Sequence, residues 1–336
     1  MMLFVSDLDR TIIFSRRFIE SVQEERSYQV VEEVNGEERS FITETALHLL
    51  NKVRSSVMFV PVTTRTKEQY ERIQLFQRNH IPPYAVVGNG ATILRNGEVD
   101  QEWHHHVLSR CSQECVSKED VRDKLKESFP RDWLKEERDA DGWFFYYIID
   151  QEKTDEEALY SFQKWCGTQG WKATLHGRKF YLIPNPINKG DAVTYIQEKE
   201  GQTFSVSAGD SLLDLPMLKA TTIAYTAKKS DLDVSKENLP TLRVTEKDGI
   251  LSAESLLLEV LLLSSSNLDK PEILSSKAAC TLWGIDSSTL RKRKGDFPPG
   301  TIRKFGSSYA VTVSGMKAVF GSPLPSTSSI ERRVTL

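Results

Sequence analysis

The sequence predicts an α/β fold in which a parallel sheet carries helices on its faces, an α+β unit is inserted, and a small basic module follows. Near-continuous apolar runs at residues 3–5 and 57–62, and a further strand-like run at 203–208, alternate with amphipathic stretches. Such runs are typical of strands buried in a parallel sheet. From about residue 100 to residue 176 charged helical stretches and an aromatic strand replace this alternation. The chain therefore holds more than one domain.

The composition is that of a globular protein, with 336 residues of which 39% are hydrophobic and 27% charged. Residues 270–336 hold 11 Lys and Arg against 4 Asp and Glu, whereas residues 1–269 have a net charge of −10. An acidic body thus carries a basic module, and one partner need not explain both. The four cysteines have no metal or disulfide spacing, no apolar run is long enough to span a membrane, and no signal peptide is evident, so we expect a cytoplasmic protein.

The first half of the predicted sheet follows the N-terminal strand. Residues 28–43 form two strand-like runs around Asn35-Gly36, a step that favours a tight hairpin turn. Thr43 can cap the helix that follows, the strand at residues 57–62 comes next, and residues 67–79 predict one amphipathic helix. Residues 84–99 then predict a further strand and a hairpin.

The inserted unit and the return to the core complete the body. Helices are predicted near 118–129 and 156–167 with a strand at 143–150, and a strand, a turn and a helix beginning at Lys189 lead back to the apolar run that ends before Asp210. Residues 256–263 predict a buried helix. The expected domains are a core of residues 1–95 and 181–265, a cap of 96–180, a linker of 264–271, a module of 272–321 and a flexible tail of 322–336.

Three of the apolar runs end in polar residues: VSDLDRT (5–11), VTTR (62–65) and SAGDSLLD (207–214), with Lys189 at a helix start. The carboxyl ends of parallel strands meet at one edge of a sheet, so these groups should form a cluster of carboxylates, hydroxyls and one ammonium. Carboxylates so close together repel unless a hard cation such as Mg²⁺ binds them. A carboxylate can also act as a nucleophile, and a second acid beside it as a general acid and base. This pattern predicts phosphoryl transfer.

These motifs, in this order along residues 1–265, resemble those of the haloacid-dehalogenase-like phosphatase superfamily. Asp7–Thr11 corresponds to its DxDxT motif, Thr63–Arg65 to its Thr-Gly-Arg motif, Lys189 to its lysine and Gly209–Asp214 to its GDxxxD motif. The resemblance is closest to the large-cap branch of sucrose-phosphate and mannosyl-phosphoglycerate phosphatases. It implies a Rossmann-like parallel-sheet core with an inserted α+β cap, in which the hairpin at residues 28–43 is the flap.

By this resemblance Asp7 is the nucleophile and Asp9 the general acid and base. Mg²⁺ would be held by Asp7, by the backbone carbonyl of Asp9 and by Asp210, with Asp214 in support. Thr63 would bind the phosphoryl oxygens and Lys189 would neutralise their charge. The expected substrate-binding residues are Thr11, Thr64, Arg65, Arg178, Lys179 and Asn188.

Two departures from the family pattern accompany this resemblance. Leu213 stands where many relatives have Asn, and Thr64 replaces the usual Gly. The resulting prediction is a Mg²⁺-dependent phosphatase that acts on a small phosphorylated metabolite such as a sugar phosphate, through an aspartyl-phosphate. The alternatives are a phosphomutase, or a nucleic-acid-binding regulator whose body senses a phosphorylated ligand. The intact set of catalytic residues favours an enzyme over such a sensor.

The basic module resembles small helix-turn-helix modules of bacterial regulators. A helix through Leu282 ends at Gly284, a second helix runs from about residue 286 to Lys294, and a hairpin and a last helix follow. The candidates for contact with nucleic acid are Arg291, Lys292, Arg293, Lys294, Arg303 and Lys304. Phosphate contacts through these residues are one interpretation. Contact with a protein, oligomerisation and a vestigial module are the alternatives.

Overall fold

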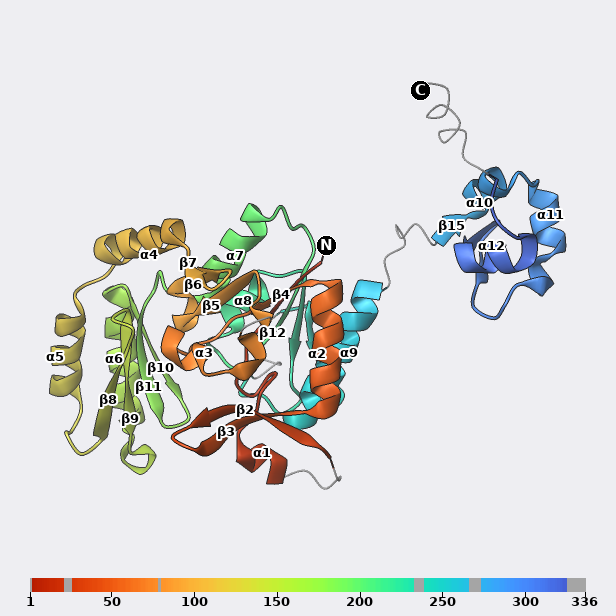
Figure 1. Cartoon of the computed structure of the whole chain (residues 1–336). Helices are drawn as coiled ribbons and strands as arrows, with labels where there is room; N and C mark the ends of the chain where they lie inside the picture. Colours follow the sequence, from red (N-terminus) through yellow and green to blue (C-terminus); the bar gives the residue numbers. More distant parts are fainter. Residues whose placement is uncertain (1, 21–25, 78–79, 233–238, 266–272, 325–336) are drawn as a thin grey trace, which may run out of the picture. The chain divides into compact units, whose positions relative to one another are not determined.

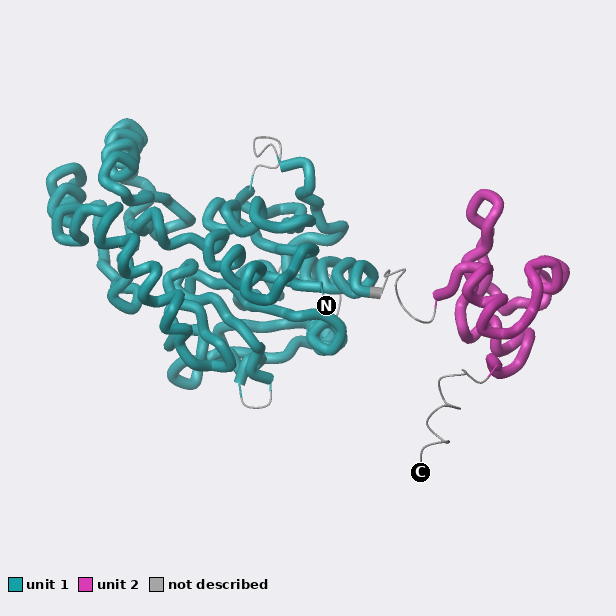
Figure 2. The backbone as a smooth tube through the Cα atoms, turned by 90° about the horizontal axis from the view of Figure 1, so that it is seen from above, with its two compact units in different colours: residues 1–264 teal, residues 265–336 magenta. Residues whose placement is uncertain are grey.

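The computed structural model describes residues 2–20, 26–77, 80–232, 239–265 and 273–324. The chain forms two compact units, residues 1–264 and residues 265–336, and each is described by itself (Figure 2). Residues 266–271 of the predicted linker and residues 325–336 of the predicted tail lie outside the described residues. Among the helices of the described residues, none is long and apolar enough to cross a membrane.

The core of the first unit is a five-stranded parallel sheet in the order β14-β13-β12-β1-β4. Its strands are β1 (Leu3–Ser6), β4 (Met58–Pro61), β12 (Ser205–Ala208), β13 (Ile223–Thr226) and β14 (Leu242–Val244). The central strand β1 is buried along its whole length, as its apolar sequence predicts. The parallel pairing confirms the fold class inferred from the alternation of strands and helices.

Helices cover both faces of this sheet (Figure 1). Those that surround it are α2 (Glu44–Ser56), α3 (Lys67–Glu71), α7 (Lys189–Lys199), α8 (Leu215–Lys219) and α9 (Ser252–Ser265). Helices α2 and α9 share one apolar cluster with Phe4. Helices α7 and α8 share another with Leu3 and Val5. Because Phe4 and its neighbours Leu3 and Val5 belong to different clusters, β1 is packed on both sides.

The predicted flap hairpin is present as β2 (Tyr28–Val34) and β3 (Glu37–Thr43), after the short helix α1 (Arg16–Glu20). Asn35 and Gly36 have φ values of 55° and 77°, the left-handed conformation that a two-residue hairpin turn requires. The Thr43 hydroxyl accepts a hydrogen bond from the Ala46 amide and so caps α2 as expected.

The helix predicted over residues 67–79 is wrong in its extent. Helix α3 ends at Glu71, Ile73 is extended, and a 3₁₀ turn follows at Gln74–Phe76. Ile73, Leu75 and Phe76 are all buried. Where the chain leaves the helical path, all three of these side chains join the apolar cluster that also contains α2 and Phe4.

A small antiparallel sheet follows, made of β5 (Tyr84–Val87), β6 (Thr92–Arg95) and β7 (Glu98–Val99). It lies beside the parallel sheet through one bridge between Val62 and Val86. The strand predicted at residue 84 is therefore confirmed, but it begins a second sheet instead of extending the first.

The cap is a four-stranded antiparallel sheet in the order β10-β11-β9-β8, with helices on one side (Figure 1). Its elements are α4 (Gln101–Glu114), α5 (Lys118–Ser128), β8 (Leu134–Ala140), β9 (Phe144–Ile149), α6 (Glu156–Thr168), β10 (Trp171–His176) and β11 (Lys179–Pro184). Helices α5 and α6 share an apolar cluster with Phe145 and Phe180. On the other face of the sheet, Tyr146 and Tyr181 belong to the cluster of the core. The cap sheet extends to Pro184, beyond the boundary at residue 180 that the sequence predicts.

The second unit contains β15 (Ile273–Ser275), α10 (Ser276–Trp283), α11 (Ser287–Lys292), β16 (Ile302–Phe305), β17 (Ser308–Thr312) and α12 (Val313–Phe320). Ala279, Trp283, Leu290, Val311 and Met316 belong to its apolar cluster. Gly284 has a φ of 62° and ends α10, as predicted. Helix α11 ends at Lys292 and not at Lys294, because the chain turns into a 3₁₀ segment at Lys294–Asp296. Strand β15, which pairs with β17, was not predicted.

Candidate active site

Three acids lie at the carboxyl ends of neighbouring strands β1 and β12. Asp7 directly follows β1, and its amide donates a hydrogen bond to the carbonyl of Ala208, the last residue of β12, at 2.9 Å. Asp210 and Asp214 follow β12. One carboxylate oxygen of each of Asp7, Asp210 and Asp214 lies within 4.8 Å of the others, and all three residues are buried. The register of the parallel strands thus forms the predicted acidic cluster.

Lys189, the first residue of α7, reaches into this cluster and is 1% exposed. Its ammonium lies 2.6 Å from Asp7 Oδ1 and 2.5 Å from Asp214 Oδ1. Burial disfavours the charged lysine, but the two carboxylates outweigh burial and raise the pKa of Lys189 above its ordinary value.

One ammonium does not neutralise three carboxylates. Burial, assisted by Asp214 and Asp9 against the attraction of Lys189, raises the pKa of Asp7 to about 7. Burial, with Asp214 and Asp7, also raises the pKa of Asp210 to about 8, although Arg10 opposes this shift. The cluster therefore lacks positive charge.

The loop between β12 and α8 fixes Asp214. Its Oδ2 accepts hydrogen bonds from the Asp210 amide at 3.1 Å, the Ser211 amide at 2.9 Å and the Ser211 hydroxyl at 2.8 Å. A Cβ atom on Gly209 would lie 2.4 Å from the Cβ of Asp214. Only glycine allows this loop to fold back so closely, which explains its place in the GDSLLD sequence.

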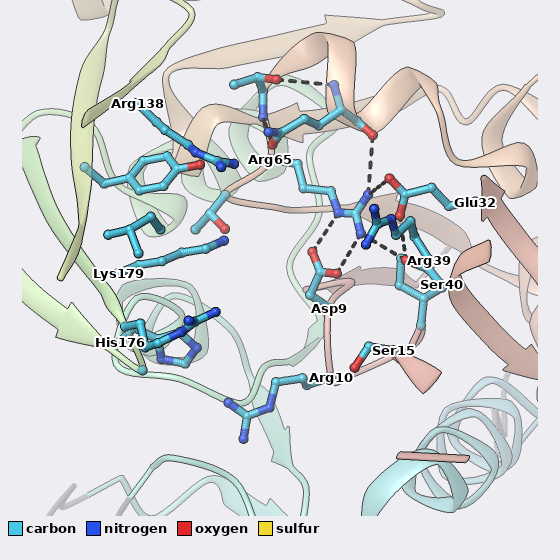
Figure 3. A pocket seen from close by; sticks show the side chains of 18 of the residues that line it. Asp9, Arg10, Ser15, Glu32, Arg39, Ser40, Arg65, Arg138, His176 and Lys179 are labelled. Atoms are coloured by element: carbon cyan, nitrogen blue, oxygen red, sulfur yellow. Dashed lines mark hydrogen bonds and ion pairs between the residues drawn. The ribbon is translucent and has the colours of Figure 1, made fainter. Parts of the chain in front are cut away.

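Asp9 lines the pocket and binds Arg65. The guanidinium donates to its two oxygens at 2.7 Å and 2.8 Å, and it also lies 2.8 Å from Glu32 and 3.2 Å from the Ser40 hydroxyl, both on the flap (Figure 3). Desolvation opposes ionisation of Asp9, but Arg65 outweighs it and lowers the pKa of Asp9. Arg65 thus connects Asp9 to the flap hairpin.

A pocket of about 940 Å³ opens between core, flap and cap, and it is large enough for a small molecule. The core contributes Asp9, Thr64 and Arg65, and the flap contributes Glu32, Val34, Arg39 and Ser40 to its lining. The cap contributes Arg138, Tyr146, Gln151, His176, Arg178, Lys179 and Tyr181, among others. Figure 3 shows Arg138, His176 and Lys179 across the pocket from Asp9 and Arg65.

The remaining predicted site residues fall into two groups. Thr11 lies beside Asp7, with its hydroxyl 3.4 Å from Asp7 Oδ2, and Thr63 is fully buried at the end of β4, where its hydroxyl accepts from the Arg65 amide at 3.2 Å. Like Asp7, Thr11, Thr63 and Lys189, Asn188 lies outside the pocket lining. Its side chain instead caps α7 by accepting from the Asp191 amide, so the structure gives it a role in holding the helix that carries Lys189.

A family model described as sucrose-6F-phosphate phosphohydrolase matches residues 1–236, more than half of the chain. The chain belongs to this family. It is therefore a phosphoric monoester hydrolase of the haloacid-dehalogenase superfamily. A second model, described as a helix-turn-helix domain, matches residues 268–323.

Individual relatives have low sequence identity to this chain. A glucosyl-3-phosphoglycerate/mannosyl-3-phosphoglycerate phosphatase of Persephonella marina is 26% identical over 255 residues, which cover 66% of this chain and 87% of the relative. The sucrose-phosphatase of Synechocystis sp. PCC6803, solved with sucrose and phosphate, covers 79% of this chain and 98% of its own, with a TM-score of 0.55 and 15% identity. The crystal structure of Thermoplasma acidophilum 0175 covers 78% of this chain and 100% of its own, with a TM-score of 0.51 and 13% identity. These structures share the fold.

Sequence reasoning missed several residues around the pocket of this phosphohydrolase. Glu32 and Ser40 lie on the predicted flap, but nothing in their sequence shows that they bind Arg65. Tyr146 and Tyr181 lie in strands with apolar residues on both faces, so the pattern does not separate pocket from core. Arg138 lies in β8, a strand too charged to be predicted.

Leu213, in place of the Asn of many relatives, is 5% exposed and belongs to the apolar cluster that also contains Met217. The departure at this position therefore adds apolar packing behind the acidic loop.

The candidate basic residues of the second unit are all exposed: Arg291, Lys292, Arg293, Lys294, Arg303 and Lys304. Arg291 and Lys292 lie in α11, and Arg303 and Lys304 lie in β16. Arg293 forms an ion pair with Asp296 at 2.6 Å and lies over the ring of Phe320. Arg293 is thus partly engaged within its own unit.

Proposed function

We propose that the chain is a Mg²⁺-dependent phosphatase that hydrolyses a small phosphorylated metabolite of the sugar-phosphate type through an aspartyl-phosphate on Asp7. The observation that carries this proposal is the position of Asp7, buried at a strand end, 2.6 Å from Lys189 and beside two further carboxylates. The names of the family and of the Persephonella relative support a phosphorylated sugar derivative as substrate.

The acidic cluster fits a divalent cation. Asp210 Oδ2 is buried and has no hydrogen-bond partner, although Arg10 Nε lies 3.2 Å away. Oxygen ligands are those that Mg²⁺ prefers, and a cation here would supply the positive charge that the raised pKa values of Asp7 and Asp210 show to be missing. Asp7, Asp210 and the backbone carbonyl of Asp9 would hold it, with Asp214 in support. When bound, Mg²⁺ would neutralise charge on the phosphoryl oxygens.

The proposed reaction has two displacements at phosphorus. Asp7 attacks, a bond forms between its carboxylate oxygen and phosphorus, and the bond between phosphorus and the substrate oxygen breaks while Asp9 gives that oxygen a proton. Water then attacks the aspartyl-phosphate, gives its proton to Asp9, and releases phosphate from Asp7. Lys189 and Thr63 bind the phosphoryl oxygens during both steps.

The ion pair between Arg65 and Asp9 favours the second of these two steps and opposes the first. It favours the ionised form of Asp9, which is the form that accepts a proton from water. The first step needs Asp9 protonated and therefore requires this ion pair to loosen when substrate fills the pocket.

The test is release of phosphate from p-nitrophenyl phosphate and a panel of sugar, nucleotide and glycerate phosphates, with and without Mg²⁺, by the wild type and by Asp7→Asn. Release that needs both Mg²⁺ and Asp7 is the expected result, and detection of free phosphate without an isomerised product separates a phosphatase from a phosphomutase. Folded protein that releases no phosphate from any substrate, or that releases it equally after Asp7→Asn, would contradict the proposal.

A second candidate function, nucleic-acid binding, concerns the C-terminal unit. It is supported by the match to a helix-turn-helix domain and by the exposed basic residues on α11 and β16. Binding of the full-length chain to random duplex DNA should weaken steeply with salt. Replacing Arg291 and Lys292 with Ala should reduce the slope of log affinity against log salt by roughly one for each phosphate that the variant no longer neutralises.

The control for this measurement is Lys317→Ala on α12, an exposed lysine on a different helix. Equal binding by both variants and the wild type would contradict a DNA-contacting α11. No binding at low salt would direct attention to a protein partner.

A further inference from the structure

The side chain of Arg10, the residue that follows Asp9, lies between two carboxylates of different kinds. Its Nε is 3.2 Å from Oδ2 of Asp210, an acid of the buried cluster. Its terminal nitrogens Nη1 and Nη2 donate to the two oxygens of Asp231 at 2.7 Å and 3.0 Å. Neither Arg10 nor Asp231 takes part in the reaction proposed above.

The two contacts of Arg10 are unequal. Both oxygens of Asp231 accept hydrogen bonds, a bidentate arrangement that fixes the plane of the guanidinium. Asp210 Oδ2, by contrast, is buried and has no hydrogen-bond partner among the described residues, so the Nε–H group of Arg10 is not directed at it. Arg10 therefore places positive charge beside this oxygen without using its lone pairs.

Asp231 is held beside the acidic cluster by its backbone. Its amide donates to the carbonyl of Asp210 at 2.9 Å, and its carboxylate also lies 3.3 Å from His176 Nδ1 on the cap. The hydrogen bonds from Arg10 lower the pKa of Asp231, which favours its charged form. Arg10 is thus shared between a carboxylate whose two oxygens it binds and a buried carboxylate that it leaves open.

The backbone of Arg10 is strained in this position. Its φ is 64°, in the left-handed region that glycine adopts far more readily than arginine. The Arg10 amide donates to the carbonyl of Ile13 at 2.8 Å, which holds the loop in this shape. A strained residue beside a buried acidic cluster points to a use for its side chain.

The charge of Arg10 opposes a cation that binds Asp210. Such a cation needs the lone pairs of Asp210, and a guanidinium 3.2 Å away repels it. Without Asp231, the guanidinium would be free to bind Asp210 through two parallel hydrogen bonds, the geometry that it prefers with a carboxylate. Asp231 therefore keeps Asp210 open.

We propose that Arg10 is the counter-ion of Asp210 in the metal-free protein, and that Asp231, by holding the guanidinium, sets how tightly the acidic cluster binds a divalent cation. Arg10 and Asp231 are positioning residues, since both act through Asp210. This inference rests on the Mg²⁺ site of the proposed function. It adds to that site a control of metal affinity by two residues that are not ligands.

The test measures the Mg²⁺ dissociation constant of the full-length chain by isothermal titration calorimetry in a double-mutant cycle. Arg10→Gln removes the repelling charge and should bind Mg²⁺ about tenfold more tightly, the order of effect that a neighbouring charge has on a carboxylate. Asp231→Asn frees Arg10 to bind Asp210 and should bind Mg²⁺ about tenfold more weakly, as expected for competition with a charge-assisted hydrogen bond.

The double variant Arg10→Gln/Asp231→Asn shows how Asp231 acts. If Asp231 acts through Arg10, its replacement has no effect once residue 10 is Gln, and the dissociation constant should match that of Arg10→Gln within about twofold.

Asp248→Asn is the matched control for the loss of a carboxylate. Asp248 lines the same cavity of about 200 Å³ as Arg10 and Asp210, but it pairs with Lys229. Its replacement removes the same charge and should change the dissociation constant by less than about twofold. Thermal unfolding of each metal-free variant verifies that the fold is retained.

The outcomes separate this inference from the proposed function. If Asp231→Asn weakens Mg²⁺ binding equally with Arg10 and with Gln at position 10, or if Asp248→Asn weakens it as much, Asp231 acts as a distant charge and the inference is overturned. Unchanged affinity in both single variants also overturns it and leaves the metal site intact. Absence of Mg²⁺ binding by the wild type overturns the metal site and this inference together.

Discussion

The acidic cluster of Asp7, Asp210 and Asp214, called the floor below, and the cap wall of the pocket are built in opposite ways. On the floor, Asp7, Asp210 and Asp214 are 5%, 5% and 0% exposed, and Lys189 or backbone amides hold Asp7 and Asp214 in place. On the wall, Arg178 and Lys179 are exposed and, among the described residues, lack ionic partners. The floor is preorganised for chemistry, whereas the wall has charges that a ligand must satisfy. Under the proposed function, this difference predicts that changes to the wall alter selectivity and leave the reaction itself intact.

After loss of the nucleophile Asp7 itself, the largest expected effect comes from Asp9, which lies between floor and wall. Asp9→Asn should lower kcat for alkyl phosphates by about 10³-fold, within the range for loss of a general acid and base. With p-nitrophenyl phosphate, whose leaving group needs no proton, the first step should persist and hydrolysis of the aspartyl-phosphate should become limiting. Rapid-quench kinetics should then show a burst of about one p-nitrophenol per active site.

Asp7→Asn is the control for this burst, because it removes the proposed nucleophile and should abolish both phases. If Asp9→Asn hydrolysed alkyl phosphates at the wild-type rate, Asp9 would not be the general acid and base.

Binding of Mg²⁺ should stabilise the folded protein through the residues of the floor and not through those of the wall. In the metal-free protein Asp7 and Asp210 keep protons up to about pH 7 and about pH 8, whereas the unfolded chain loses them near 3.8. The folded state thus binds more protons, and these two groups make it less stable as pH rises from about 4 to 8. Because Mg²⁺ binds the ionised forms, it should raise the melting temperature more at pH 8 than at pH 5. At 100 times its Kd the gain is about 2.7 kcal/mol.

Asp210→Asn provides the comparison for this measurement, since it removes a proposed ligand and one of the two titrating groups. Differential scanning calorimetry of both proteins, with Mg²⁺ and with chelator, gives the four curves needed. Equal stabilisation at both pH values, or an undiminished Mg²⁺ effect in Asp210→Asn, would count against the metal site.

The same contrast explains what the sequence could predict. Asp7, Asp210 and Lys189 follow a strand or begin a helix, so the topology of a parallel sheet brings them together whatever the details of side-chain packing. The Asn35-Gly36 turn and the Thr43 cap are local features, and local patterns predict them. Each of these depends only on backbone geometry.

The wall depends on tertiary contacts that no local pattern shows. The alternation in β9 and β11 is obscured because one face packs on α5 and α6 and the other faces the core and pocket. Likewise, the contact of Arg65 with Glu32 joins residues from separate elements. The helix predicted over residues 67–79 ends early although its pattern is amphipathic, because Ile73 is extended and buried in the core, which the local pattern does not show.

Replacing Arg65 tests the contact that joins Asp9 to Glu32 on the flap hairpin. Arg65→Gln should lower kcat about tenfold to a hundredfold with little change in KM, because Asp9 loses the group that orients it. It should also destabilise the fold, since Glu32 is 5% exposed and would be left as a buried unpaired charge.

Arg65→Gln/Glu32→Gln separates these two effects. The double variant should regain stability but not activity if Arg65 positions Asp9, whereas recovery of both would reduce Arg65 to a structural role. Arg16→Gln, which removes an exposed flap ion pair with Glu38, is the matched control and should change neither quantity appreciably.

Replacing Leu213 should have the smallest effect, and it tests whether the apolar packing beneath the acidic loop is fixed. Leu213→Asn restores the residue of many relatives, but at 5% exposure it places an amide in an apolar cluster and should cost about 1–2 kcal/mol of unfolding free energy. The neighbouring Leu212 is 45% exposed, so Leu212→Asn should change stability by less than about 0.5 kcal/mol. Urea unfolding measures both. A Leu213→Asn protein with unchanged stability and tighter Mg²⁺ binding would mean that this position can turn toward the acidic cluster, and the floor would then be adjustable in the way that the wall is.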